Sequence, residues 1–98
     1  MNNEKNLHSL FTLGRTVATP GALDLIEQTG TDVLTLLRHH VSGDWGALDE
    51  QDRQENDRAA RKGSRILSAY ELGPDKTRIW IITEWDRSAT TLLLPGEY

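Results

Sequence analysis

The residues best suited to chemistry gather around Asp44 and Trp45. Glycines at positions 43 and 46 bracket this acid and this tryptophan, and His40 precedes them. A structural interpretation is a connection between two helices, in which Trp45 fills the core and Asp44 hydrogen-bonds backbone amides. A functional interpretation places His40 and Asp44 at the mouth of a pocket with Trp45 as its floor. The pattern favours the structural interpretation, and Asp44 and Trp45 remain candidate binding residues.

Two polar residues, Asp52 and Asn56, fall on the face of a predicted helix that must turn inward. Steps of four from Leu48 reach both, and this stretch has too few apolar residues to form a buried face without them. A buried polar group without a partner costs about 1 to 3 kcal/mol, so both side chains need hydrogen bonds. They either form a network that ties the helix to its surroundings or line a polar binding site.

The catalytic candidates are His40, Arg65, Glu84 and Arg87. Glu84 shares a predicted strand face with Trp80, and a carboxylate held against aromatic surface can act as a general acid or base. In a phosphodiester-cleaving site, His40 or Glu84 would be the base. Arg65 or Arg87 would then hold the phosphate. Alternatively, each of these residues has a structural role and forms a hydrogen bond or an ion pair.

The chain lacks the residues that several other kinds of catalysis and binding require. The sequence has no cysteine, so it has no thiolate ligand and no thiol nucleophile. His39 and His40 are adjacent and point to different faces of a helix. A metal site would need His40, Asp44 and a distant carboxylate, and no ligand spacing in the sequence is diagnostic of one. A Gly-x-Ser-x-Gly elbow and a Walker-type glycine loop are also missing. We therefore predict neither a metal site nor a cofactor.

The elements that must position these residues are predicted from periodicity and from capping residues. Thr19, Asp32 and Asp49 are predicted to start helices that end near Gly30, Ser42 and Gly63. Alternating apolar residues predict strands over 10–18, 66–72, 77–85 and 89–94. The fold class is therefore α+β: an N-terminal strand, two to three helices and a three-stranded antiparallel meander. About four strands form one sheet with the helices on one face.

Length and charge narrow the range of partners. The 98 residues suit a single domain over 10–98, preceded by a flexible segment over 1–9. The net charge of −4 disfavours a nucleic-acid partner. A basic stretch over 58–65 still allows local contacts with phosphates. With neither a signal peptide nor a membrane-spanning stretch in the sequence, we expect a cytoplasmic protein without membrane contact.

Two segments of the chain resemble a family of small bacterial "plasmid-related proteins". The first is HVSGDWGALDEQDRQEN over His40–Asn56, and the second is WIITEWDRSATTLLLPGEY over Trp80–Tyr98. The resemblance extends over 10–98, and Trp85 departs from it, because that family more often has a small residue there. The resemblance implies a bacterial cytoplasm and an accessory role in a plasmid or integrated mobile element. The resemblance does not identify a catalytic residue in this chain.

These observations leave three hypotheses about function. The favoured one is a non-enzymatic binding or regulatory protein. Its expected partner is a macromolecule, and a protein is favoured over a nucleic acid. The alternative is a small metal-independent RNase or toxin-like domain, because the order of strand, helices and three strands is that of RelE-like toxins. A third is an oligomerising module that pairs through an exposed edge strand. The expected state is a monomer or a homodimer.

Overall fold

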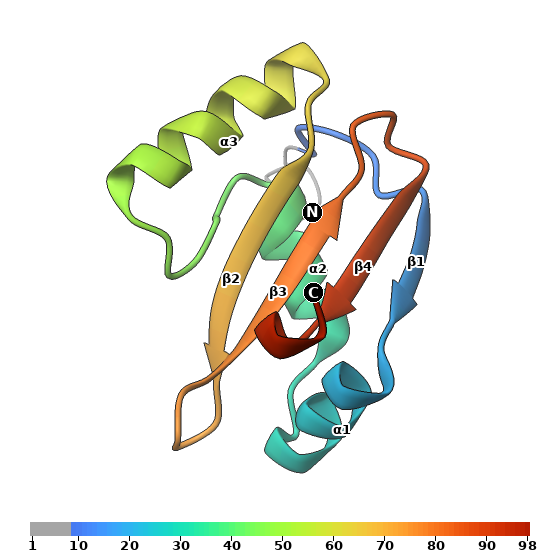
Figure 1. Cartoon of the computed structure of the whole chain (residues 1–98), viewed down its shortest axis with the longest axis vertical. Coiled ribbons are helices and arrows are strands. Elements are labelled where there is room, and N and C mark those ends of the chain that lie inside the picture. The colour runs from blue at the N-terminus through green and yellow to red at the C-terminus, as the bar shows by residue number, and fades with distance from the viewer. Residues whose placement is uncertain (1–8) are drawn as a thin grey trace, which may run out of the picture.

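The computed structural model describes residues 9–98, so the predicted flexible segment over 1–9 lies almost wholly outside the described residues and stays a prediction. The element order is strand, three helices and three strands, followed by a short 3₁₀ helix (Figure 1). The elements are β1 (Arg15–Ala18), α1 (Pro20–Thr29), α2 (Val33–Val41), α3 (Glu50–Lys62), β2 (Ile66–Leu72), β3 (Thr77–Thr83), β4 (Ala89–Leu93) and η2 (Pro95–Glu97).

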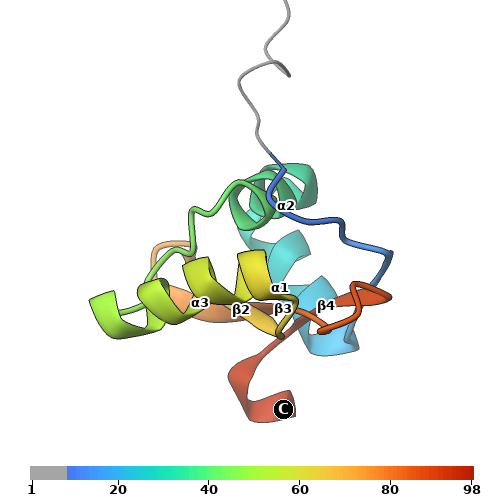
Figure 2. The same cartoon turned by 90° about the horizontal axis from the view of Figure 1, so that it is seen from above.

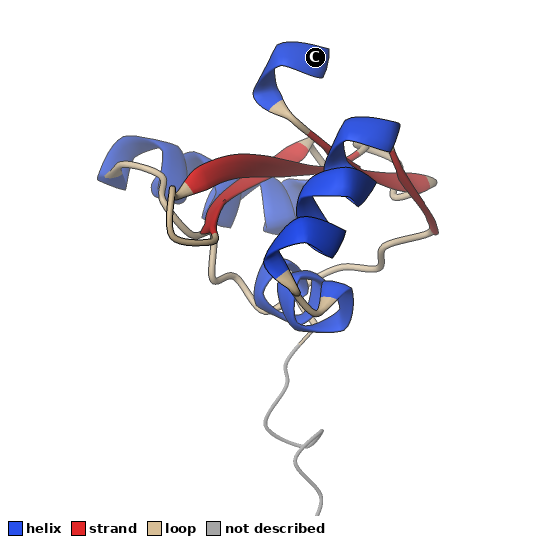
Figure 3. Cartoon of the chain, turned by 90° about the horizontal axis from the view of Figure 1, so that it is seen from below, coloured by secondary structure: helices blue, strands red, loops and turns tan. Residues whose placement is uncertain are grey.

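The four strands form one sheet in the order β1-β4-β3-β2, which confirms the α+β class and the meander. Strands β2, β3 and β4 are antiparallel, whereas β1 joins β4 in parallel, so the sheet is mixed. Helices α1 and α2 lie on one face of the sheet, α3 runs beside the outer edge of β2, and η2 lies on the other face (Figures 2 and 3). We call the face turned away from α1 and α2 the open face.

Local capping explains where the helices begin. Side-chain oxygens of Thr19, Asp32 and Asp49 accept hydrogen bonds from amides in the first turn of α1, α2 and α3, at 3.1, 3.1 and 2.9 Å. Helices α1 and α3 end at Gly30 and Gly63, as predicted. The three predicted helix starts are therefore confirmed.

The buried core lies between the helices and the sheet in two neighbouring clusters. One lies beneath α1 and α2 and contains Ile79 and Ile81 of the central strand β3. The other contains Phe11, Trp45, Ala59 and Ile66 and lies toward α3. Alternation along 77–85 predicts that Ile79 and Ile81 share one face, and this is confirmed because both belong to the helix-side cluster.

The first strand is shorter than predicted. The sequence indicated a strand over 10–18, but only Arg15–Ala18 pairs with β4. Gly14 interrupts the pattern: its φ is +64°, and a β-carbon there would collide with the carbonyl oxygens of Arg87 and Ser88. Upstream of this glycine, Phe11 turns away from the sheet ladder and packs 6.2 Å from the ring of Trp45.

The buried side of α2 also differs from the prediction in part. Helical periodicity predicts a buried stripe of Val33, Leu34, Leu37 and Val41, yet Leu34 is 61% exposed. Leu36 and His40 are buried instead. These two residues are four positions apart, so they share one side of the helix, and that side faces the sheet. The spacing of His40 three or four residues after Leu36 and Leu37 predicts that it leans toward the core, and its burial confirms this.

Candidate functional site

His40 lies at the centre of a sealed hydrogen-bond chain. Its side chain has no exposed surface. Nδ1 lies 2.6 Å from Ser68 Oγ on β2, and Nε2 lies 2.9 Å from Thr83 Oγ1 on β3. Thr83 Oγ1 lies 2.7 Å from Thr90 Oγ1 on β4, and that hydroxyl donates to the carbonyl oxygen of Leu13 at 2.7 Å. The chain of contacts therefore links α2 to three adjacent strands.

The direction of every proton in this chain follows from its last member. The carbonyl of Leu13 can only accept, so Thr90 donates to it and must accept from Thr83. Because the hydroxyl of Thr83 donates its only proton to Thr90, it must accept a hydrogen bond from Nε2–H of His40. The remaining nitrogen, Nδ1, accepts from the hydroxyl of Ser68. His40 is thus held as the neutral tautomer that carries its proton on Nε2.

This environment makes His40 unsuitable as a catalytic base. Burial, with a smaller contribution from the positive charge of Arg87, lowers the pKa of His40 from 6.5 to about 3. A base must reach its substrate, and the Phe11 and Trp45 rings pack against the imidazole in T-shaped arrangements, with centroids 5.1 and 6.1 Å away. His40 therefore belongs to the core rather than to a surface site.

The predicted pocket of Asp44, Trp45 and His40 does not form. Trp45 is buried, and its Nε1 donates to Asp57 Oδ1 at 2.9 Å, which binds the loop to α3. The carboxylate of Asp44 is exposed and lies 2.9 Å from Nδ1 of His39, not near His40. The structural interpretation of this loop is the one that the geometry supports, with Trp45 filling the core.

The two residues of α3 that were predicted to face inward, Asp52 and Asn56, differ in their exposure. Asn56 is buried, as predicted: Nδ2 donates to the carbonyl oxygen of Leu67 at 2.6 Å, and Oδ1 accepts from the amide of Leu67 at 3.3 Å. Asp52 is exposed, so the prediction that it faces the interior is wrong. The buried residues of α3 are Asn56 and Ala59, which places the inward side of this helix in its second half, beyond Asp52.

Arg87 has a structural role. Its guanidinium donates to the carbonyl oxygens of Ala59, Ser64 and Glu84 at 2.9, 2.6 and 3.0 Å. These contacts satisfy carbonyl groups at the C-terminal end of α3 and in the β3–β4 turn. Its guanidinium carbon also lies 5.3 Å from the centroid of the Phe11 ring. With its donors directed at the backbone, Arg87 is not positioned to bind a phosphate.

The remaining catalytic candidates, Arg65 and Glu84, lie next to each other on the open face. Arg65 Nε is 3.9 Å from Glu84 Oε1, and Nη1 of Arg65 donates to the hydroxyl of Tyr98 at 2.6 Å. The Tyr98 ring packs against Trp80 with a centroid separation of 5.8 Å. We call Arg65, Trp80, Glu84 and Tyr98 the open-face cluster, and it is the candidate site.

Sheet register and the C-terminal segment together build the open-face cluster. Ile66 of β2 pairs with Thr83 of β3, so the residues just outside this pair, Arg65 and Glu84, are directed to the same face. Tyr98 reaches them because η2 folds back across the open face. Glu97 holds η2 in place: its carboxylate accepts from Gly21 N at 3.2 Å and from Leu94 N at 2.8 Å.

Sequence reasoning placed Trp80 on the correct face but did not include it or Tyr98 among the site residues. Trp80 carried a signal, because its strand position predicts the same face as Glu84. Tyr98 carried none, because its place depends on how η2 folds back. Its side chain is 66% exposed although its ring is held between Trp80 and Arg65.

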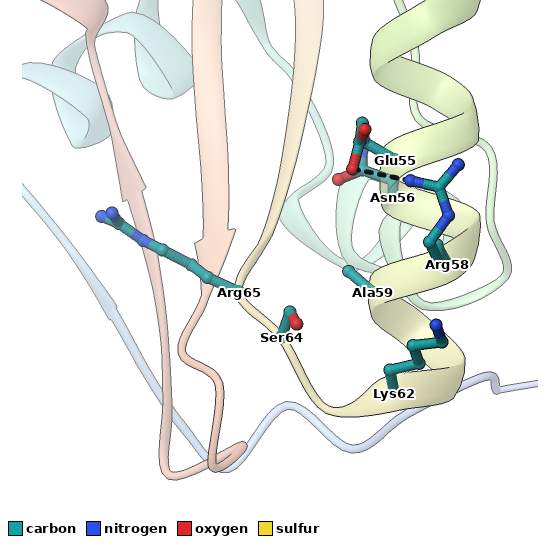
Figure 4. A pocket seen from close by; sticks show the side chains of 7 residues that line it. All are labelled: Glu55, Asn56, Arg58, Ala59, Lys62, Ser64 and Arg65. Carbon is teal, nitrogen blue, oxygen red and sulfur yellow. Dashed lines mark ion pairs between the residues drawn. The ribbon is translucent and has the colours of Figure 1, made fainter.

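A second polar feature is a cleft of about 170 Å³ between α3 and the start of β2 (Figure 4). Its lining includes Arg58, Lys62 and Ser64. Arg58 is paired with Glu55 at 3.0 Å, which offsets part of the positive charge. The side chain of Arg65 runs away from α3 and leaves the cleft toward the sheet (Figure 4). The cleft therefore does not gather the converging cations that a phosphate site needs.

Residues 9–98 contain no group of three histidine, aspartate or glutamate side chains arranged to hold a metal ion. Among the same residues, no helix has the length and apolar character needed to cross a membrane. Comparison of the chain with protein-family models, with curated proteins and with solved structures gave no match. The function must therefore be inferred from the geometry of the chain itself.

Proposed function

We propose that this chain is a non-enzymatic binding protein that recognises a protein partner through the open-face cluster. The observation that carries the proposal is the exposed ring of Tyr98, held between Trp80 and Arg65. Tryptophan, tyrosine and arginine dominate the binding energy of protein interfaces. A ring that is already ordered loses little conformational entropy when a partner covers it, which favours affinity.

The fate of the catalytic candidates supports binding over catalysis. His40 is sealed in the core, and Arg87 is committed to backbone carbonyls. Arg65 and Glu84 lie beside each other on the open face, where they can give a partner one positive and one negative contact. Such a pair at the rim of an interface contributes specificity and orientation more than affinity.

The resemblance to plasmid-related proteins supplies a setting for this proposal. We propose that the chain acts in a bacterial cytoplasm as an accessory protein of a mobile element, and that its partner is a protein that regulates such elements or opposes them. The negative net charge of −4 supports a protein partner, since a nucleic-acid ligand would require an extended basic surface.

The test is affinity capture from a bacterial lysate, followed by binding measurements with the purified partner. The test variants are Tyr98→Ala and Arg65→Ala. The matched control is Arg78→Ala, which removes a cation from the same sheet face, where Arg78 pairs with Glu71 at 3.6 Å. We expect each test variant to weaken binding about tenfold or more, since a hot-spot residue contributes at least 1 to 2 kcal/mol.

The control should bind like the unmodified chain, and thermal unfolding of all three variants should show that they are folded. Equal binding by every variant would place the interface elsewhere and reject the open-face cluster. Failure to recover any stoichiometric partner would count against a binding function.

A second candidate function, a small metal-independent RNase, is favoured by one observation. The carboxylate of Glu84 and the guanidinium of Arg65 lie 3.9 Å apart on an exposed face, with the hydroxyl of Tyr98 beside them. In this reading Glu84 is the base, Arg65 binds the phosphate, and Tyr98 orients Arg65.

The RNase hypothesis is tested by incubating the purified chain with single-stranded RNA and by measuring growth arrest on expression. We expect Glu84→Gln and Arg65→Ala to abolish any cleavage, and Arg78→Ala to retain it. Because His40 is in the core, His40→Ala should act only through unfolding. Absence of cleavage by the unmodified chain, or cleavage that survives both variants, would reject this function.

A further inference from the structure

The two edges of the sheet differ in how they are protected. The edge at β2 is sealed in two places. The amide and the carbonyl of Leu67 both bond to the side chain of Asn56. Ala69 donates to the carbonyl of Trp45 at 3.1 Å and accepts from the amide of Ala47 at 2.7 Å. A sealed edge cannot pair with another strand.

The opposite edge, β1, has no such cover among residues 9–98. The amides of Arg15 and Thr19 donate to carbonyl oxygens of Ser88 and Leu92, both at 3.0 Å. Because backbone groups alternate in direction along a strand, the amide and carbonyl groups of Thr16 and Ala18 point the other way, out of the sheet. β1 is the last strand in the sheet order, so these groups face outward (Figure 1).

We propose that the chain forms a two-fold symmetric dimer in which β1 pairs antiparallel with β1 of a second copy, centred on Val17. In this register Thr16 lies opposite Ala18 of the second copy. Residues whose backbone groups point outward form hydrogen-bonded pairs, and each of the two Thr16–Ala18 pairs exchanges both of its hydrogen bonds. The register therefore satisfies every outward group of the strand, and the two sheets become one.

The side chain at the centre suits this register. Val17 is 41% exposed. It pairs with Thr91 on β4, which in turn pairs with Ile82 on β3. Because paired residues point to the same face and Ile82 alternates with the helix-side Ile81, Val17 lies on the open face. A residue at the two-fold axis between hydrogen-bonded pairs lies about 4.5 Å from its own copy, measured between α-carbons. Each Val17 would therefore cover the exposed side chain of the other.

Charge complementarity indicates a second copy as the occupant rather than an unrelated strand. Two positions from the centre on each side, Arg15 faces Thr19 of the second copy. Thr19 donates to the carboxylate of Glu97 at 2.5 Å, so a negative charge already lies beside that position. The symmetry brings the Arg15 guanidinium toward this carboxylate twice, once on each side of the axis. Opposite charges so placed stabilise strand pairing.

The short strand predicts a reversible dimer, because β1 has only four residues. Its population should rise with concentration. This inference is independent of the proposed binding function, since the dimer forms through the β1 edge and not through the residues of the open-face cluster. Val17→Lys should therefore abolish the dimer and leave capture of a partner by the open-face cluster unchanged.

The decisive experiment is oxidative cross-linking of Val17→Cys, because the chain has no cysteine of its own. Two cysteines at the centre of the pairing lie within the range of a disulfide. The matched control is Leu23→Cys, at a residue that is 53% exposed and lies on α1 and not on the pairing strand. We expect a disulfide-linked dimer from Val17→Cys and none from Leu23→Cys. Equal cross-linking at both positions, or none at position 17, would overturn the proposal.

Sedimentation over a concentration series provides an independent readout. The unmodified chain should shift from monomer to dimer as concentration rises, and Leu23→Lys should do the same. Val17→Lys should remain monomeric, because it places like charges directly opposite each other. A monomer at every concentration, or a dimer that Val17→Lys leaves intact, would reject this interface.

Discussion

Asn56 of α3 closes the outer edge of β2 by bonding to both backbone groups of Leu67. The side-chain amide donates to the carbonyl at 2.6 Å and accepts from the backbone amide at 3.3 Å, as a neighbouring strand would do. A single side chain thus ties a helix to the sheet and protects the strand from pairing with another chain. This explains why a helix with few apolar residues keeps a buried asparagine.

Replacement of Asn56 by alanine should destabilise the chain by about 1 to 3 kcal/mol, because the amide and carbonyl of Leu67 lose their partner. Urea unfolding monitored by tryptophan fluorescence measures the change. The matched control is Gln51→Ala, which removes an exposed amide from the same helix and should change stability by less than about 0.5 kcal/mol. Equal stability of the two variants would contradict the role of Asn56.

The tautomer of His40 is a direct prediction of the hydrogen-bond chain. Nitrogen-15 NMR of the imidazole should show a single neutral form with the proton on Nε2, because Thr83 accepts at that nitrogen. The signal should not titrate between pH 7 and about pH 4, since burial lowers the pKa of His40 to about 3. A proton on Nδ1, or a titration near pH 6.5, would contradict the deduced directions.

The same burial makes stability depend on pH. The folded pKa of His40 is about 3, below the ordinary value of 6.5. Between these two values the unfolded chain binds a proton that the folded chain excludes, so stability falls as pH falls. The slope due to His40 should approach about 1.4 kcal/mol per pH unit. His40→Gln should flatten the measured profile by that amount, and a slope in the variant equal to that of the unmodified chain would contradict the prediction.

Arg87 should be irreplaceable by lysine. Its guanidinium reaches three backbone carbonyls, on Ala59, Ser64 and Glu84, and one ammonium group cannot span them. We expect Arg87→Lys to destabilise the chain by about 2 kcal/mol or more, measured as a lower midpoint of unfolding. Arg78→Lys, in an exposed ion pair with Glu71, should cost less than about 0.5 kcal/mol. Similar midpoints for both variants would show that Arg87 does not cap α3.

Glu97 should couple the C-terminal segment to α1 in a pH-dependent way. Hydrogen bonds from the side chain of Thr19 and from the amide of Leu94 lower the pKa of Glu97 below its usual 4.5. A lowered carboxyl pKa stabilises the fold above the unfolded value, and the contribution is lost as pH falls through the folded pKa. Glu97→Gln should therefore be less stable than the unmodified chain at pH 7.

The difference caused by Glu97→Gln should shrink toward pH 3, and chemical unfolding at the two pH values measures it. Glu71→Gln serves as the control, because Glu71 is exposed and its partner Arg78 lies 3.6 Å away in a surface pair. A difference between Glu97→Gln and the unmodified chain that is constant over this range would exclude the carboxylate as its cause.

Part of the candidate site could be predicted from the sequence. The inward position of Asn56 followed from the scarcity of apolar residues on α3, and the common face of Trp80 and Glu84 followed from strand alternation. The same reasoning failed for Asp52, because periodicity gives the angle around a helix but not how far along the helix the contact with the sheet extends. The two buried residues of α3, Asn56 and Ala59, both lie beyond Asp52 along the helix.

The helix starts at Thr19, Asp32 and Asp49 and the meander of β2, β3 and β4 were determined by the sequence alone. Caps, turns and alternation depend on residues that are neighbours in the chain, so their physics is local. The tertiary structure decided the parallel pairing of β1 with β4, the enclosure of His40 and the return of Tyr98 to Trp80 and Arg65. Each of these joins segments far apart in the chain, and the free energy of such contacts depends on which surfaces the whole fold brings together.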